Sequence, residues 1–305
     1  MSISVKNISK SFKTVKAVDN ISFDVSEGEL FGLIGPDGAG KTTLFRILTT
    51  ILIADEGSAS VANYDVLKEY KSIRNSVGYM PGKFSLYQDL TVEENLSFFA
   101  TIFGTTIEKN YDLIKDIYVQ IEPFKKRRAG KLSGGMKQKL ALCCALIHKP
   151  KVLFLDEPTT GVDPVSRKEF WDMLKRLKEK GITILVSTPY MDEAALCDRI
   201  ALIQEGKILT IDSPQNIVAN HIKKIYNVSA TDTYKLILDL KKYPTSGSVY
   251  AFGEYIHYTD AKESFNPADL NEYLLQHNHT QIEIHIADAT IEDVFMDLAV
   301  SGKIE

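Results

Sequence analysis

Eight consecutive residues constrain the fold of this chain more than any other feature: Gly35-Pro36-Asp37-Gly38-Ala39-Gly40-Lys41-Thr42. They follow an apolar run at residues 30–34 and precede a helical pattern at residues 42–51, so they are expected to connect a strand to a helix. Glycines let successive backbone N–H groups turn toward phosphate oxygens, and the N-terminus of the following helix adds a positive potential. The pattern therefore predicts a phosphate-binding loop in an α/β fold.

The side chains of this loop indicate how a nucleotide would be held. Lys41 is expected to reach the outer phosphates as a mobile cation, and Thr42 to offer its hydroxyl to Mg²⁺. Thr43 belongs to the same predicted binding segment. Asp37 is an unusual neighbour for phosphate, and we expect its side chain to point away while only its backbone lines the loop.

The rest of the chain predicts two domains, residues 1–220 and residues 221–305. In the first domain, predicted strands alternate with predicted helices: strands at 21–25, 30–34, 77–80, 152–155 and 182–187, and helices at 42–51, 92–103, 133–148 and 164–180. Continuous apolar strands of this kind are typical of a buried parallel sheet. The second domain reads as strand, helix, two strands, helix, strand and a terminal helix, which predicts a small α+β domain of the ferredoxin-like type.

Composition excludes several classes of function. The net charge of −4 gives no overall field that would gather nucleic acid. Three cysteines are too few for a disulfide framework, which indicates a reducing, cytoplasmic compartment. The first residues lack the apolar core of a signal peptide, and no uncharged apolar run of roughly 18 residues could span a bilayer. Any role at a membrane is therefore expected to depend on a partner chain.

Three further motifs identify a family. The segment Leu132-Ser133-Gly134-Gly135-Met136-Lys137-Gln138 resembles the signature motif of ABC transporter ATPases. The apolar run at 152–155, followed by Asp156-Glu157-Pro158, resembles their Walker B motif, and Gly161-Val162-Asp163 resembles their D-loop. Order and spacing match from about residue 2 to residue 214. The segments at 188–194 and 289–295 resemble the bacterial drug- and lipid-exporter branch of this family.

This resemblance implies a P-loop NTPase domain with a helical subdomain, and it assigns roles to individual residues. Phe12 would stack on adenine, and a core phenylalanine is the less favoured alternative. Asp156 would hold Mg²⁺ through water, and Glu157 would be the catalytic carboxylate that polarises the attacking water. The residues expected to bind ATP and its Mg²⁺ are Phe12, Gly35, Pro36, Asp37, Gly38, Ala39, Gly40, Lys41, Thr42, Thr43 and Asp156. In this family the signature residues, here Ser133, Gly134 and Gly135, cap the nucleotide of a second ATPase.

Two residues depart from the family pattern. Gly82 stands where a glutamine is expected after the strand at 77–80, and Gln88 lies too far along the loop to replace it. Pro189 stands where the family has a switch histidine, and proline offers neither a side-chain hydrogen bond nor an N–H. Thr188 is one residue out of register. Both changes affect the γ-phosphate region, so we expect slow hydrolysis at this chain's own site.

The expected function is that of the ATP-hydrolysing subunit of an ABC exporter, peripheral on the inner face of the cell membrane. It would drive a separate membrane permease and form the degenerate half of an asymmetric pair with a second ATPase; a homodimer that hydrolyses normally is the alternative. A second interpretation is a soluble ABC ATPase that acts on ribosomes or DNA. The single cassette and the lack of long coiled coils argue against it. A non-hydrolysing, ATP-dependent assembly subunit is a third.

Overall fold

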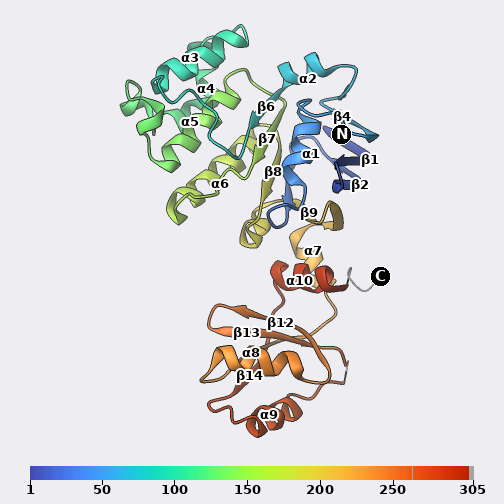
Figure 1. Ribbon diagram of the computed structural model, residues 1–305. Coiled ribbons are helices and arrows are strands. Elements are labelled where there is room, and N and C mark those ends of the chain that lie inside the picture. The colour runs from blue at the N-terminus through green and yellow to red at the C-terminus, as the bar shows by residue number, and fades with distance from the viewer. Residues whose placement is uncertain (263, 302–305) are drawn as a thin grey trace. The chain divides into compact units, whose positions relative to one another are not determined.

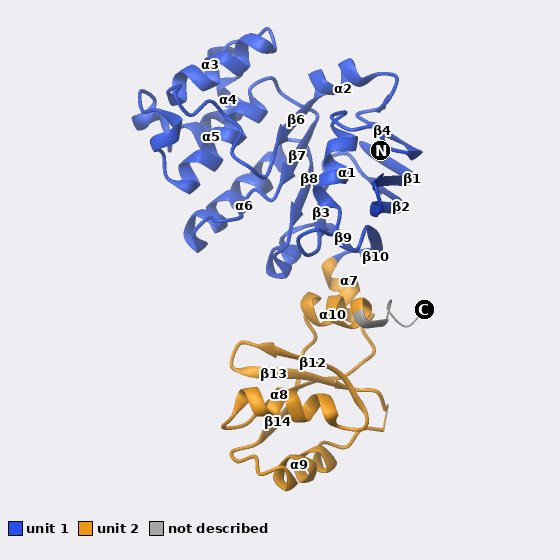
Figure 2. Ribbon diagram, in the orientation of Figure 1, with its two compact units in different colours: residues 1–213 blue, residues 214–305 orange. Residues whose placement is uncertain are grey.

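The computed structural model describes residues 1–262 and 264–301 and divides into two compact units, residues 1–213 and residues 214–305 (Figure 2). Helix α7 (Pro214–Ala219) belongs to the second unit, where it contacts the last helix, although the sequence places the boundary after residue 220. Each unit is described by itself.

A six-stranded sheet forms the centre of the first unit, with the strand order β10-β9-β3-β8-β7-β6. Its strands are β3 (Leu30–Ile34), β6 (Val77–Met80), β7 (Val152–Asp156), β8 (Thr183–Thr188), β9 (Arg199–Gln204) and β10 (Lys207–Asp212). The strands from β9 to β6 pair in parallel, and only β10 pairs antiparallel, with β9. The predicted α/β class with a largely parallel sheet is therefore confirmed.

A second, antiparallel sheet covers one side of this core and was largely missed by the sequence patterns. It has the order β2-β1-β4-β5 and consists of β1 (Ile3–Phe12), β2 (Val15–Val25), β4 (Glu56–Val61) and β5 (Tyr64–Asp65). Helix α1 (Lys41–Leu48) packs in the same apolar cluster as both sheets, and the rings of Phe45 and Phe154 meet edge to face at 5.8 Å. This packing fixes the start of α1 at the end of β3.

The remaining helices of the first unit include a helical subdomain, as expected. Helices α3 (Val92–Ile102), α4 (Tyr111–Tyr118) and α5 (Gly134–Leu146) gather on one side of β6 and β7, while α1 lies on the other side (Figure 1). Helices α2 (Tyr70–Ser76) and α6 (Pro164–Glu179) complete the unit. In the part of the chain that the structure describes, no helix combines the length and the apolar character needed to cross a bilayer.

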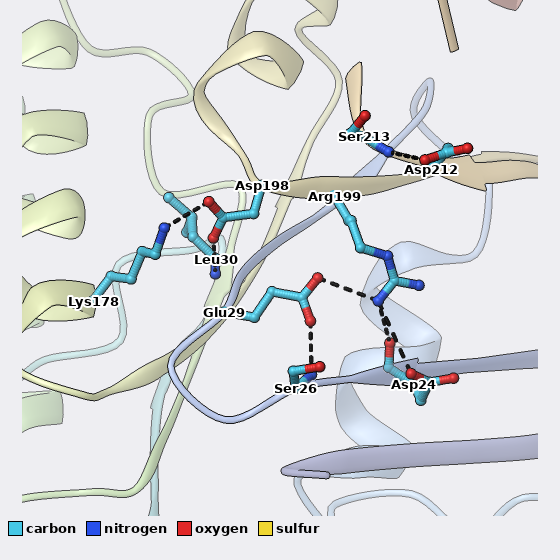
Figure 3. Close-up of polar contacts among 9 residues, drawn as sticks. All are labelled: Asp24, Ser26, Glu29, Leu30, Lys178, Asp198, Arg199, Asp212 and Ser213. Atoms are coloured by element: carbon cyan, nitrogen blue, oxygen red, sulfur yellow. Dashed lines mark hydrogen bonds and ion pairs between the residues drawn. The ribbon is translucent and has the colours of Figure 1, made fainter. Parts of the chain in front are cut away.

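Charged side chains fix the end of β3 that lies opposite the phosphate-binding loop (Figure 3). Glu29, which is 8% exposed, forms an ion pair with Arg199 of β9 at 3.3 Å. Asp198 accepts the backbone N–H of Leu30 at 2.9 Å and the ammonium of Lys178 from α6 at 2.6 Å. These contacts fix the positions of β3, β9 and α6 relative to one another. They thereby fix the position of the other end of β3, where the loop begins.

The second unit has the predicted succession of elements. Its strands are β11 (Ile225–Ser229), β12 (Ser246–Phe252), β13 (Tyr255–Asp260) and β14 (Glu283–Ala287), and its other helices are α8 (Thr233–Lys242), α9 (Pro267–Gln276) and α10 (Ile291–Ser301). The sheet order β12-β13-β11-β14, with antiparallel pairs, agrees with the β-α-β-β-α-β motif. Helices α8 and α9 bury leucines against one face of this sheet.

The start of α10 is fixed to the sheet by a buried carboxylate, Asp293, which is 1% exposed. It accepts hydrogen bonds from the backbone and hydroxyl of Thr290, from the hydroxyl of Tyr250, and lies 2.6 Å from Nδ1 of His257. Burial raises the pKa of Asp293, but these hydrogen bonds outweigh burial and leave the pKa below its ordinary value. The carboxylate is therefore a stabilising contact only while it is ionised.

Candidate active site

The predicted phosphate-binding loop connects β3 to α1, and its glycines are required by its surroundings. A Cβ atom on Gly35 would lie 2.1 Å from the carbonyl oxygen of Ile203, and one on Gly40 would lie 2.2 Å from that of Ala17. Gly40 also has a φ of +102°, which residues with a side chain rarely adopt. The loop is therefore packed tightly between β2 and β9, whereas Asp37 is exposed to solvent.

Lys41 connects this loop to the end of β7. Its side chain is 3% exposed, and its ammonium donates to the carbonyl oxygens of Gly35 at 2.7 Å and Pro36 at 3.0 Å. The same ammonium forms an ion pair with Glu157 at 3.2 Å. A buried cation held mainly by neutral carbonyls has capacity for a further anion, as a phosphate-binding lysine requires.

Thr42 and Asp156, which are 114 residues apart in the sequence, meet at the same place. The hydroxyl of Thr42 donates to Oδ1 of Asp156 at 3.2 Å, and the hydroxyl of Ser187 donates to the same oxygen at 2.7 Å. A hydroxyl and a carboxylate oxygen suit Mg²⁺, which prefers a few protein oxygens supplemented by water and phosphate. Within the described residues, no group of three or more His, Cys, Asp or Glu side chains is placed to hold a metal ion by itself.

Glu157 is held at the edge of the sheet by its backbone. Its N–H donates to the carbonyl oxygen of Ser187 at 3.0 Å and to the hydroxyl of Ser187 at 3.1 Å. Its φ of +51° is uncommon for a residue with a side chain and costs on the order of 1 kcal/mol. The side chain is 22% exposed, so the carboxylate reaches solvent beside Lys41.

Tyr79 of β6 adds to the electrostatics of this edge. Burial, followed by the negative charge of Asp156, raises the pKa of Tyr79 to about 12, although Arg46 of α1 opposes the change. The phenol therefore stays protonated at neutral pH. The phenol therefore adds no charge to this edge, where the side chains of Lys41, Asp156 and Glu157 meet.

Both positions that depart from the family pattern lie at this edge. A Cβ atom on Gly82 would lie 3.1 Å from the carbonyl oxygen of Asp156 and 3.8 Å from Cβ of Glu157. Gln88 lies elsewhere, because its carbonyl oxygen accepts the N–H of Gly130 at 2.9 Å. A glutamine side chain at position 82 would thus start beside Asp156, and Gln88 contacts a different segment.

Pro189 follows Thr188, the last residue of β8. The carbonyl oxygen of Thr188 accepts the N–H of Gly35 at 3.2 Å, so position 189 adjoins the start of the phosphate-binding loop. The hydroxyl of Thr188 donates to Glu193, so its hydrogen is engaged by the segment that follows β8. That Thr188 is a poor replacement for the missing histidine stays a prediction.

The other predicted site residues lie apart from this cluster. Phe12 ends β1 and is 47% exposed, which excludes the alternative that it is a core phenylalanine. The signature-like segment begins α5, where the hydroxyl of Ser133 accepts the N–H of Met136 at 3.4 Å. A Cβ atom on Gly135 would lie 2.8 Å from the hydroxyl oxygen of Ser166, so this segment adjoins the start of α6.

Sequence patterns missed two residues at this edge, Ser187 within the site and Glu193 beside it. Ser187 pairs in register with Asp156 across the parallel strands β7 and β8. That register could have been inferred, because parallel strands end at a common edge. Glu193 gave no such signal, since its partners are spread over 34 residues of sequence.

Comparison with known proteins gives consistent results. The family model described as ABC transporter matches residues 18–160. A probable multidrug ABC transporter ATP-binding protein, YbhF of Escherichia coli K12, is 41% identical over 71% of this chain, but the match spans only 38% of that relative's length. A Nod factor export ATP-binding protein I of Burkholderia thailandensis is 35% identical over 97% of this chain and 96% of its own.

Solved structures agree. An ATP-binding subunit of an ABC transporter superposes with a TM-score of 0.66 at 26% identity, over 72% of this chain and 92% of that one. A bacterial ABC transporter cassette solved as a dimer gives a TM-score of 0.63 at 26% identity, over 69% and 98%. The phosphate-binding loop, the acidic pair at the end of β7 and these matches lead to one conclusion: this chain belongs to the family of ABC transporter ATP-binding proteins.

Proposed function

We propose that this chain binds Mg-ATP at the edge of its central sheet and acts as the motor subunit of an exporter. The observation that carries the proposal is the meeting of Lys41, Thr42, Asp156 and Glu157 at the end of β3 and β7. Lys41 would exchange its contact with Glu157 for the outer phosphates, and Thr42 and Asp156 would hold Mg²⁺ with water. Glu157 would then be free to orient the attacking water. Phe12 is exposed and could stack on adenine.

The second part of the proposal is that this site turns over slowly. Gly82 adjoins the acidic pair, Pro189 follows the residue that contacts the start of the loop, and neither provides the donor that the family uses there. Binding of ATP depends on other residues and is retained. The chain would then supply its signature segment, of which Ser133 and Gly134 are exposed, to the faster site of a second ATPase.

The third part concerns partners. Relatives carry names of multidrug and Nod factor export, which favours export through a separate membrane permease and a peripheral position on the inner face of the membrane. Residues 221–305 would contribute dimer contacts or stability. The losses at positions 82 and 189 also favour a second candidate, an ATP-dependent assembly subunit without turnover.

Equilibrium binding of a fluorescent ATP analogue in Mg²⁺ tests the first part. We expect Lys41→Ala to weaken binding by at least about 10-fold, as loss of a charge-assisted hydrogen bond implies. Lys68→Ala is the matched control, because Lys68 is an exposed lysine in the turn between β5 and α2. Equal affinity in wild type and Lys41→Ala would contradict the site. Co-purification tests the partners: a permease and a second ATPase support the exporter, and ribosomes or DNA contradict it.

A further inference from the structure

One buried carboxylate beside the candidate site has no role in the proposed chemistry. Glu193 lies in the 3₁₀ helix η4 (Met191–Leu196) that follows β8, and it is 1% exposed. Its Oε2 accepts the hydroxyl of Thr188, and its Oε1 accepts the hydroxyl of Thr159 at 2.7 Å. Arg167 supplies the balancing charge, with Nε 3.6 Å from Oε1. A buried charge is costly unless its partners are well placed, so each of these contacts constrains the segment that supplies it.

The three partners come from three segments around the site. Thr188 directly precedes Pro189 and accepts the N–H of Gly35, the first residue of the phosphate-binding loop. Thr159 lies two residues after Glu157. Arg167 lies in the first turn of α6, just beyond residues 161–163, the segment that resembles the D-loop.

Arg167 closes this network on its outer side. Its guanidinium lies over the ring of Tyr190 at 4.2 Å, and its ion pair with the exposed Asp192 is longer, at 3.8 Å. Tyr190 in turn donates its N–H to the hydroxyl of Thr188 at 3.1 Å. The loop that contains Pro189 is therefore bound on both of its flanks to the segment at residues 159–167.

We propose that Glu193 is a positioning residue that transmits nucleotide occupancy from the phosphate-binding loop to residues 159–167. A phosphate that orders Gly35 also fixes the carbonyl oxygen of Thr188, and Glu193 passes that constraint to Thr159 and Arg167. The inference rests on the proposed function for its ligand and adds a route by which ATP in this site orders the segment facing a second ATPase. Proline at position 189 leaves this route intact, since it uses Thr188 and not residue 189.

Hydrogen exchange of the full chain, measured by mass spectrometry with and without a non-hydrolysable Mg-ATP analogue, tests this route. The backbone N–H groups of Thr160 and Val162 donate to Glu157 and Thr159, so this segment has amides whose exchange can report ordering. In the wild type, we expect the analogue to slow exchange in both the loop at 35–48 and the segment at 159–167. In Glu193→Ala, we expect the loop to remain protected while the nucleotide-dependent change at 159–167 is lost.

The controls separate this role from a general loss of stability. Asp192→Ala removes the other carboxylate beside Arg167. The side chain of Asp192 is 74% exposed, so this variant should behave as the wild type. If Glu193→Ala does not fold, Thr159→Val removes one arm of the network and should reduce the response at 159–167 only. A full nucleotide-dependent response at 159–167 in folded Glu193→Ala, or in Thr159→Val, would overturn the proposal.

The nucleotide-free sample separates this proposal from the proposed function. Without nucleotide, we expect Glu193→Ala to speed exchange at both 186–190 and 159–167 by about 10-fold, because both lose a hydrogen bond to a charged group. If the wild-type loop gains no protection from the analogue, ATP binding is refuted, whereas the linkage is still decided by the nucleotide-free comparison. Unchanged exchange at both segments would refute the linkage itself.

Discussion

Restoring the two residues that depart from the family pattern should accelerate ATP hydrolysis by this chain. The variant Gly82→Gln/Pro189→His adds a side chain that begins 3.1 Å from the carbonyl oxygen of Asp156 and an imidazole next to the residue that holds Gly35. Pro189→His also restores a backbone N–H at that position. Neither change removes a contact made by Lys41, Thr42 or Glu157.

The magnitude follows from the placement of these groups. One preorganised donor at a transition state is worth about 10² to 10³ in rate, or about 2.7–4 kcal/mol. The two effects are not additive, because both groups would act on the same phosphoryl region beside Glu157. The tight approach of Gly82 to Asp156 also requires a small shift of the backbone. We therefore expect a gain of at least about 10² in kcat for the double variant.

The assay is steady-state phosphate release by the full chain at saturating Mg-ATP. Affinity for a fluorescent ATP analogue and the thermal unfolding midpoint must be measured alongside, so that a folding defect is recognised. Adding Glu157→Gln to the double variant is the control, and it should abolish the gain. Turnover within about 2-fold of the wild type, in a double variant that folds and binds ATP, would refute the reasoning, since a gain of that size is below any donor effect.

Three further outcomes are expected from single substitutions. Thr42→Val removes the hydroxyl that meets Asp156, so ATP affinity in Mg²⁺ should fall about 10-fold and the difference should vanish in EDTA, by equilibrium binding. Glu29→Gln leaves Arg199 without its nearest carboxylate, so urea unfolding should show a loss of about 1–2 kcal/mol; a loss at the level of surface substitutions would contradict the buried contact. The pKa of Asp293 lies below its ordinary value near 3.8, so its stabilisation is present above that pH and is lost as the pH falls through the lower, folded-state pKa. Asp293→Asn should lower the unfolding midpoint at neutral pH and show a weaker decline below about pH 4, by thermal scans.

The sequence was informative where local pattern decides the structure. The strand Leu30–Ile34 was predicted residue for residue, because a continuous apolar run before a glycine-rich loop has few alternatives. Strand β1 was missed for a specific reason. Its buried residues Ile3 and Val5 alternate, but an irregularity with Asn7 at a φ of +52° shifts the phase before Ile8.

The candidate site also contains residues that local sequence patterns identify and residues that they do not. Lys41, Thr42, Asp156 and Glu157 could be identified because motif and spacing determine where parallel strands deliver them. Glu193 could not be identified, because its role depends on a hydrogen bond to Thr159 across 34 residues of sequence. Such a contact is created by the arrangement of β7, β8 and α6, and no local pattern of residues encodes it.

The central claim is that this site holds Mg-ATP and hydrolyses it slowly. The most direct measurement is the steady-state ATPase rate of the purified full chain, compared with Glu157→Gln under conditions where both bind ATP. We predict a wild-type rate within about 10-fold of the Glu157→Gln rate, because the missing donors already limit the transition state. A vigorous wild-type rate that Glu157→Gln abolishes would contradict the claim and show that Gly82 and Pro189 do not impair the site.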